Sequence, residues 1–135
     1  MSMTDVRVSA LDELLRVTLL VRRHIEQVAE RFDVSPPGAR LLLALDRPLR
    51  MAEAAQQSAC EPSHLTAVAD ALQQAGLLVR EPDPADKRAR RLVLTEEGLA
   101  LREKIVPALL TDAPVVASLS DRECKALVDL LSTDR

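Results

Sequence analysis

The chain has 135 residues, 47% of them hydrophobic, and a formal net charge of −3, which suits one domain with a hydrophobic core. Apolar runs such as residues 41–45 are too short to span a bilayer, and the chain does not begin with the pattern of a secretion signal, so neither a membrane partner nor export is expected. Two cysteines, Cys60 and Cys124, are too few for a disulfide framework and favour a reduced, cytoplasmic protein.

Residues 11–32 are predicted to form one long helix. From Leu11 to Phe32 the apolar residues alternate at intervals of three and four, the spacing of a helix that packs along a seam. Further apolar residues make this stripe broader than one neighbouring helix covers. The pattern fits a central helix packed within one domain, and it fits a helix packed against a second subunit.

Three shorter helices are predicted next. A serine cap followed by proline is typical of a helix start, so a helix is expected from Ser35 to about Asp46. An alanine-rich helix follows over residues 51–59. Another helix covers residues 63–75 and ends at Gly76, a typical C-cap residue. The last two helices, separated by a few residues, are a candidate helix-turn-helix.

The sequence after Gly76 predicts a β-hairpin. Residues 77–79 and 91–95 are short, apolar, β-prone runs, and the polar stretch 81–90 between them has the residues of a turn. We therefore expect a hairpin with a charged tip.

Two helices are predicted to complete the chain. The first begins at Thr95, has acidic residues in its first turn and runs to about Leu110, with a kink expected at Pro107. Ser120 to Glu123 form a capping box that opens the last helix.

The segment from Arg47 to Gly98 resembles the winged-helix core of the MarR (multiple antibiotic resistance regulator) family. The strongest similarity is to that family's wing signature, and it lies in Asp83-Pro84-Ala85-Asp86-Lys87-Arg88, Leu92-Val93-Leu94-Thr95 and Gly98. Upstream, Leu72 and Ala75-Gly76-Leu77-Leu78-Val79-Arg80 resemble the passage from the recognition helix into the first wing strand.

The resemblance implies a mostly helical α+β fold, a winged helix-turn-helix. A single domain over residues 1–135 would have its DNA-binding core at about 35–98, with dimerisation helices at 8–33 and 99–135. The expected function is a transcriptional regulator, a repressor that binds an inverted-repeat duplex operator as a homodimer and is released by a small-molecule effector. Dimer contacts are expected at Leu11, Leu14, Val21, Leu127 and Leu131.

Composition favours duplex DNA over single strands as the partner. Phe32 is the single aromatic residue, whereas proteins that bind single strands or read RNA sequence stack bases on aromatic side chains. An acidic net charge is unusual for a DNA-binding domain. Phosphate contacts, however, are local and screened over about 10 Å, and basic residues cluster between Arg80 and Arg91.

In the expected recognition helix, one face should be buried and the first turns should meet base edges. The buried face is predicted to hold Leu65, Val68, Ala69 and Leu72. The predicted DNA contacts are Ser63, His64, Thr66 and Ala67. The alternative for each contact is a cap or a solvated surface residue, and Ser63 in particular has the residue type of a cap.

The expected wing supplies basic side chains for contacts outside the major groove. The predicted DNA contacts there are Arg80, Asp86, Lys87, Arg88 and Arg90. Arg88 suits insertion into a narrow minor groove, where the negative potential is strongest, and Asp86 is expected to hold its guanidinium by a bidentate contact. The alternative is a solvated charged turn.

Four residues depart from the family's pattern. Ala67 and Ala71 stand where many members have arginine or other polar residues, and Ala59 stands at a turn where glycine is frequent. Asp70 adds a negative charge, although an acid there is common in relatives and suits a brace for an arginine. With the acidic net charge, these departures support an alternative function, a winged-helix protein-interaction module that has lost specific DNA binding.

Many family members bind small compounds in a crevice beside the dimer helices. The resemblance implies Arg16, Arg23 and His24 as candidate effector contacts, and a solvated face is the alternative for each. An aromatic-lined pocket is excluded, so aliphatic side chains and an arginine would hold any effector.

Metal, cofactor and catalytic sites are not expected. His24 and His64 and the two cysteines are scattered, without the paired spacing of zinc sites. Cys60, aligned with the family, occupies a buried apolar position of the turn and is predicted to be a core residue rather than a redox switch. Cys124 lies on the apolar face of the last helix and is also predicted to be a core residue. No glycine-rich phosphate loop or nucleophile elbow is present, so the chain is not predicted to be an enzyme.

Overall fold

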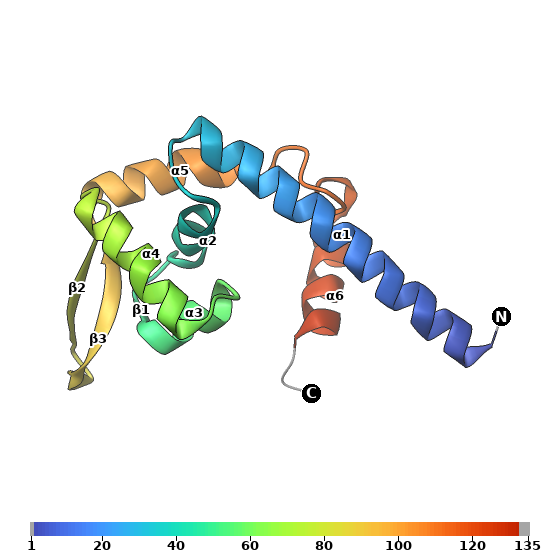
Figure 1. The fold of residues 1–135 in the computed structure, drawn as a ribbon, viewed down its shortest axis with the longest axis horizontal. Coiled ribbons are helices and arrows are strands. Elements are labelled where there is room, and N and C mark those ends of the chain that lie inside the picture. The colour runs from blue at the N-terminus through green and yellow to red at the C-terminus, as the bar shows by residue number, and fades with distance from the viewer. Residues whose placement is uncertain (1, 133–135) are drawn as a thin grey trace. The chain divides into compact units, whose positions relative to one another are not determined.

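A computed structural model describes residues 2–132 of the chain and gives a mostly helical α+β fold (Figure 1). In chain order its elements are α1 (Met3–Arg31), α2 (Pro36–Ala44), β1 (Leu49–Arg50), α3 (Met51–Gln57), α4 (Pro62–Gln74), β2 (Leu78–Asp83), β3 (Asp86–Leu94), α5 (Glu96–Leu110), a 3-10 helix at Val116–Ser118 and α6 (Asp121–Leu131). The predicted fold class is confirmed. Among the described residues, 25–108 form one compact unit, and the residues before and after this segment form a second unit.

The core of the first unit lies where its helices meet the sheet. Its largest buried side chains include Leu41, Leu42, Leu65, Leu78, Leu92 and Ile105, from α2, α4, both hairpin strands and α5. Burying one such side chain contributes about 1.5–3 kcal/mol. Arg102 of α5 also donates hydrogen bonds to the carbonyls of Leu42 (2.9 Å) and Leu43 (3.0 Å), which ties α5 to the last turn of α2.

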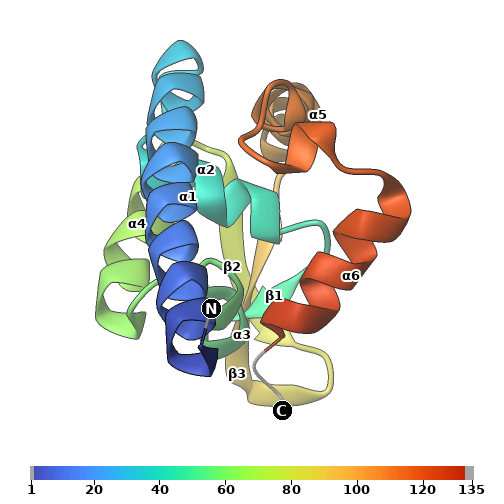
Figure 2. The same ribbon diagram turned by 90° about the vertical axis from the view of Figure 1, so that its right-hand side faces the viewer.

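Three strands form an antiparallel sheet in the order β1-β3-β2 (Figure 2). Leu78 pairs with Leu94 at one end of the hairpin and Asp83 with Asp86 at the other, so the turn is reduced to two residues. The prediction that 81–90 is a polar turn is therefore wrong for most of that stretch. Antiparallel strands tolerate charged side chains on a solvated face, and the main-chain ladder continues through them.

Local signals set the helix boundaries of this unit. Ser35 Oγ accepts a hydrogen bond from the Gly38 N–H at 3.0 Å, so the predicted cap of α2 is confirmed. The helix itself ends at Ala44, slightly earlier than expected. The short strand β1 was not predicted, because a two-residue strand carries no periodicity of its own.

The Thr95–Gly98 motif joins the hairpin to α5. The Thr95 hydroxyl donates to the Gly76 carbonyl (2.7 Å) and accepts from the Gly98 N–H (3.1 Å). Gly76 has a φ of +79°, the left-handed region that glycine enters at no steric cost. A Cβ at Gly98 would lie 1.9 Å from the Leu77 carbonyl oxygen. Glycine is thus required at position 76 by the left-handed backbone and at position 98 by the lack of space for a Cβ.

The second unit contains most of α1, together with the 3-10 helix and α6. The helix α1 begins at Met3 rather than at residue 11, because Ser2 and Asp5 cap it reciprocally (3.1 and 3.2 Å) before the apolar stripe starts. The capping box of α6 is confirmed by hydrogen bonds between Ser120 and Glu123 in both directions. The helix α5 continues through Pro107 to its end at Leu110.

Large apolar side chains are exposed throughout this second unit. Leu11, Leu14 and Leu131, three of the predicted dimer contacts, are 57%, 50% and 53% exposed, while Val21 and Leu127 are half-buried. Within residues 2–132, no helix combines the length and the apolar character that crossing a membrane requires.

Candidate nucleic-acid interface

The helix α4 has one buried face and one exposed face, as its sequence predicts. Leu65, Val68, Ala69 and Leu72 are buried, at the i, i+3, i+4 and i+7 positions of one stripe. The predicted contact residues Ser63, His64, Thr66 and Ala67 are all exposed. The apolar stripe thus anchors the helix in the core and turns its polar first turns toward solvent.

The first turn of α4 is not capped by a side chain. The helix begins at Pro62, so the cap position is Glu61, which makes no side-chain cap bond, and the alternative that Ser63 is a cap is wrong. The Thr66 hydroxyl donates to the Pro62 carbonyl at 3.3 Å. An uncapped helix start leaves backbone N–H groups directed outward, where an anion can accept from them.

The wing, defined as the hairpin of β2 and β3, presents three cations at its outer end. Lys87, Arg88 and Arg90 are exposed, and within residues 2–132 none of them forms an ion pair. Because side chains alternate along a strand, Arg88 and Arg90 lie on one face and Lys87 on the other. The three form a local positive region on an acidic chain.

The predicted contact between Asp86 and the Arg88 guanidinium is not formed in the described structure. Instead, Asp86 Oδ1 accepts a hydrogen bond from the Arg88 backbone N–H at 3.1 Å. A carboxylate two residues before an N–H reaches that donor in a short local ring, whereas the arginine side chain extends into solvent. Asp86 therefore shapes the backbone at the turn rather than the position of the guanidinium.

Arg80 belongs to the predicted DNA contacts, but its guanidinium is engaged by α4. Nη2 lies 2.7 Å from Asp70 Oδ1 and 3.4 Å from the Thr66 carbonyl, and Nη1 donates to Gln73 Oε1. These partners stand at positions 66, 70 and 73, along one side of the helix. The expectation that Asp70 braces an arginine is confirmed, and Arg80 ties the wing to α4.

Two further ion pairs cross the sheet. Arg91 Nη2 lies 2.6 Å from Glu81 Oε1, between paired strands. Arg50 Nε lies 2.5 Å from Asp83 Oδ2. The hydrogen bond from Arg50 and the Ala85 N–H hold the pKa of the Asp83 carboxyl below its ordinary value, and the same pair raises the pKa of Arg50. The role of Arg50 was not predicted from the sequence, because no local pattern links residues 33 positions apart.

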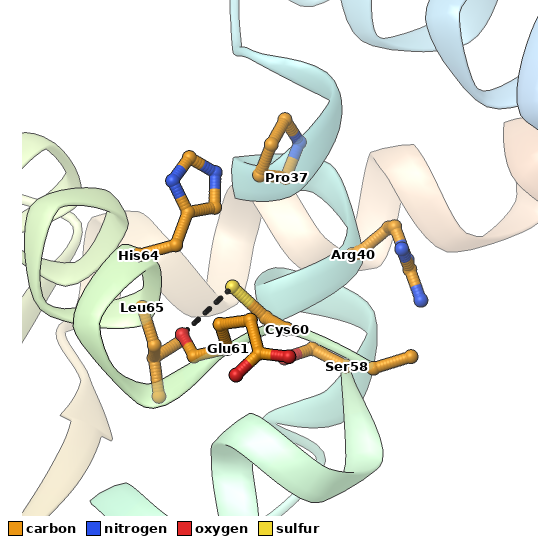
Figure 3. Close-up of a pocket in the computed structure, with 8 residues that line it drawn as sticks. Pro37, Arg40, Ser58, Cys60, Glu61, His64 and Leu65 are labelled. Atoms are coloured by element: carbon orange, nitrogen blue, oxygen red, sulfur yellow. Dashed lines mark hydrogen bonds between the residues drawn. The ribbon is translucent and has the colours of Figure 1, made fainter.

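A small pocket of about 240 Å³ lies beside the start of α4 (Figure 3). Its lining residues are Pro37, Arg40, Ser58, Ala59, Cys60, Glu61, His64 and Leu65. Figure 3 shows the His64 and Arg40 side chains on opposite sides of the pocket, so the two basic groups do not converge.

The cysteines are only half-buried, contrary to the predicted core positions. Cys60 Sγ points to the Glu61 carbonyl oxygen at 3.5 Å (Figure 3). The preceding residue, Ala59, has a φ of +51°, which costs about 1–2 kcal/mol for an L-residue and explains why glycine suits this turn. This turn leaves the thiol at the edge of the pocket rather than in the core.

The candidate effector contacts on α1 differ in their partners. Arg16 pairs with Glu13 at 2.7 Å, and His24 Nε2 lies 2.7 Å from the Leu109 carbonyl oxygen. Arg23 is exposed. Within residues 2–132, no three His, Cys, Asp or Glu side chains are grouped as a metal ion requires.

Comparisons with known proteins agree with this architecture. Residues 41–89 match the model of the MarR family. The chain is 32% identical over 98 residues to the HTH-type transcriptional regulator PecS of Dickeya dadantii (strain 3937), an alignment that covers 69% of this chain. It spans only 59% of the length of that relative.

Two solved structures show the same fold. CouR of Rhodococcus jostii RHA1, bound to p-coumaroyl-CoA, has a TM-score of 0.75 and 24% identity over 87% of this chain and 85% of its own. Sco3205 of Streptomyces coelicolor, a MarR family transcriptional regulator in complex with DNA, has a TM-score of 0.72 and 24% identity over 96% and 86%.

Proposed function

We propose that this chain, which belongs to the MarR family, is a transcriptional regulator that binds double-stranded DNA and has no catalytic activity. The observation that carries the proposal is the wing, whose exposed cations Lys87, Arg88 and Arg90 have no protein partner among the described residues. Unpaired cations at the end of a hairpin, beside a helix with an exposed polar first turn, suit the phosphates and grooves of a duplex.

In this proposal α4 enters the major groove and the wing reaches the flanking minor groove. Ser63, His64 and Thr66 would meet base edges and phosphates, and Ala67 would offer a methyl group to thymine. Arg88 would enter the minor groove. Arg80 would contribute indirectly, because its guanidinium is already held by Asp70.

We further propose that the chain acts as a homodimer and represses the promoters it binds. The exposed leucines of α1 and α6 support the dimer, since so much apolar surface is a liability in a monomer. Two-fold symmetry then demands an inverted-repeat operator, whose half-site centres lie about 34–36 Å apart.

A small-molecule effector is proposed to release the DNA. A ligand-bound structure of this fold, that of CouR, supports an effector site. Among the candidate contacts here, Arg16 and Arg23 are both exposed, and Arg23 is the one without an ion pair in the described residues. An acyl or aryl carboxylate held by aliphatic side chains and an arginine suits a chain with one aromatic residue.

Selection of bound duplexes from a random library tests the proposal. Enrichment of a dyad-symmetric consensus is expected. A consensus without a dyad would contradict the dimeric docking, and no enrichment at all would contradict DNA binding. That second outcome would favour the alternative, a protein-interaction module, which the exposed Ala67 and Ala71 on α4 and the acidic net charge support.

A further inference from the structure

The side chain of Arg50 crosses the sheet to reach the outer end of the wing. Arg50 is the last residue of β1, and Asp83 is the last residue of β2, with β3 between the two strands. Arg50 Nε lies 2.5 Å from Asp83 Oδ2, while Asp83 Oδ1 accepts a hydrogen bond from the Ala85 N–H at 2.8 Å. One carboxylate thus joins the turn of the hairpin to the strand that precedes α3.

The main-chain ladder is weakest at this same point. The register of β2 and β3 shifts between Pro82 and Asp83, and Pro82 has no N–H to donate. A two-stranded hairpin is marginally stable by itself, and β1 covers only two residues of β3. The end of the wing therefore depends on side-chain contacts for a defined position.

Arg50 differs from the unpaired cations of the wing in burial and in charge pairing. The Asp83 side chain is only 15% exposed and faces Arg50, whose side chain is 42% exposed. Lys87, Arg88 and Arg90, in contrast, are exposed without an ion pair among the described residues. A cation already neutralised by a carboxylate at 2.5 Å releases few counterions on meeting a phosphate.

We propose that Arg50 is a positioning residue for the wing: its pair with Asp83 holds the hairpin end in the orientation that presents Arg88 and Lys87 to duplex DNA, and Arg50 itself does not contact the phosphates. This inference rests on the proposed DNA-binding function. It assigns a role in DNA recognition to a residue outside α4 and outside the hairpin.

Binding measurements over a salt series separate positioning from direct contact. Arg50→Ala is expected to weaken binding to the selected duplex by up to about fivefold with an unchanged slope of log affinity against log salt. A phosphate contact would instead lower that slope by about 1 per subunit. Arg47→Ala is the matched control, since Arg47 is an exposed arginine nearby whose pair with Asp46 is long, at 3.7 Å.

The direction in which Asp83→Asn changes DNA affinity distinguishes positioning from simple electrostatics. The amide keeps an oxygen for the Ala85 N–H but loses the charge that holds Arg50. Positioning predicts weaker binding, whereas simple electrostatics predicts tighter binding because a negative charge is removed. The double variant Arg50→Ala with Asp83→Asn is expected to bind no more weakly than the weaker single variant, because both changes remove one interaction.

Amide hydrogen exchange in the free protein provides a readout without DNA. Exchange at residues 85–90 is expected to accelerate in Arg50→Ala and Asp83→Asn but not in Arg47→Ala, with global unfolding checked by circular dichroism. Unchanged exchange in this segment, a lowered salt slope for Arg50→Ala, or tighter binding by Asp83→Asn would each overturn the inference. If the parent protein binds no duplex, the proposed function fails, and exchange still decides whether Arg50 holds the hairpin end.

Discussion

Arg80 of β2 places its guanidinium 2.7 Å from the Asp70 carboxylate of α4, and this contact joins the wing to the recognition helix. The Arg80 side chain is 24% exposed, and it also reaches the Thr66 carbonyl in the first half of the helix. The two elements proposed to meet adjacent grooves of DNA are therefore linked to each other directly, and a change at the link is expected to affect both.

Removal of this link should lower specificity more than affinity. Asp70→Asn deletes a negative charge near the proposed DNA face, so affinity for random duplexes should stay equal or rise, while affinity for the selected operator should fall because α4 and the wing lose their relative register. Stability should fall by only about 0.2–1 kcal/mol, as for other exposed pairs. Fluorescence anisotropy with operator and random duplexes measures the ratio, and an unchanged ratio contradicts the link.

At the end of the wing, replacing the Asp86 carboxylate with an amide should not lower the affinity for DNA. Asp86 accepts from the Arg88 backbone N–H, and the Asn side chain offers the same acceptor. Asp86→Asn should therefore bind DNA at least as tightly as the parent, whereas Asp86→Ala should bind more weakly. If Asp86 acted on the guanidinium of Arg88, both variants would weaken binding.

Arg88→Ala serves as the reference for these wing variants. It should weaken binding to every duplex and reduce the salt slope by about 1 per subunit, because a cation at the phosphate-walled groove releases counterions. An Arg88→Ala protein with the salt slope of the parent would identify the wing as a solvated turn.

The exposed stripe of α1 should make the protein a dimer at micromolar concentration. Leu14→Asp introduces a charge into this stripe and is expected to yield monomer or aggregate in light scattering. Leu43→Asp is the matched control, because Leu43 is exposed to a similar extent (42%, against 50% for Leu14) but lies in the other unit. Monodisperse monomer in the parent, or equal effects of both variants, would contradict the proposed dimer surface.

Acid should remove the stabilisation that the Arg50 and Asp83 pair provides. The folded-state pKa of Asp83 is lowered by the hydrogen bond from Arg50 and by the Ala85 N–H. A lowered folded pKa means that the stabilisation is complete above the ordinary carboxyl value of about 4 and is lost as pH falls through the folded value. Urea unfolding of Asp83→Asn should thus depend less on pH below about 4 than that of the parent.

Glu123→Gln provides a control for the acid prediction, because the pKa of Glu123 is also lowered, by the backbone N–H of Ser120 at the start of α6. Both variants should flatten the acid side of the stability profile. Only Asp83→Asn should also alter exchange in the wing, since Glu123 lies in the other unit. A parental pH profile in Asp83→Asn would show that the pair contributes nothing to folding.

The elements that sequence analysis identified depend on interactions within a few residues. Ser35 and Ser120 cap the helices they precede, and Gly76 and Gly98 occupy positions where a Cβ is strained or has no space. The buried stripe of α4 follows from its 3.6-residue period. The reciprocal cap at Ser2 is equally local, but it was missed because the apolar stripe of α1 begins later in the chain.

The sequence by itself therefore determined the order of helices and hairpin and the cations available for DNA. Only the tertiary structure decided which of those cations are free. Arg80 and Arg50 find carboxylates 10 and 33 residues away, and these partners depend on strand order and register, which no local pattern encodes. The same dependence makes residues 81–83 part of a strand, because a polar segment pairs only when its partner strand is held beside it.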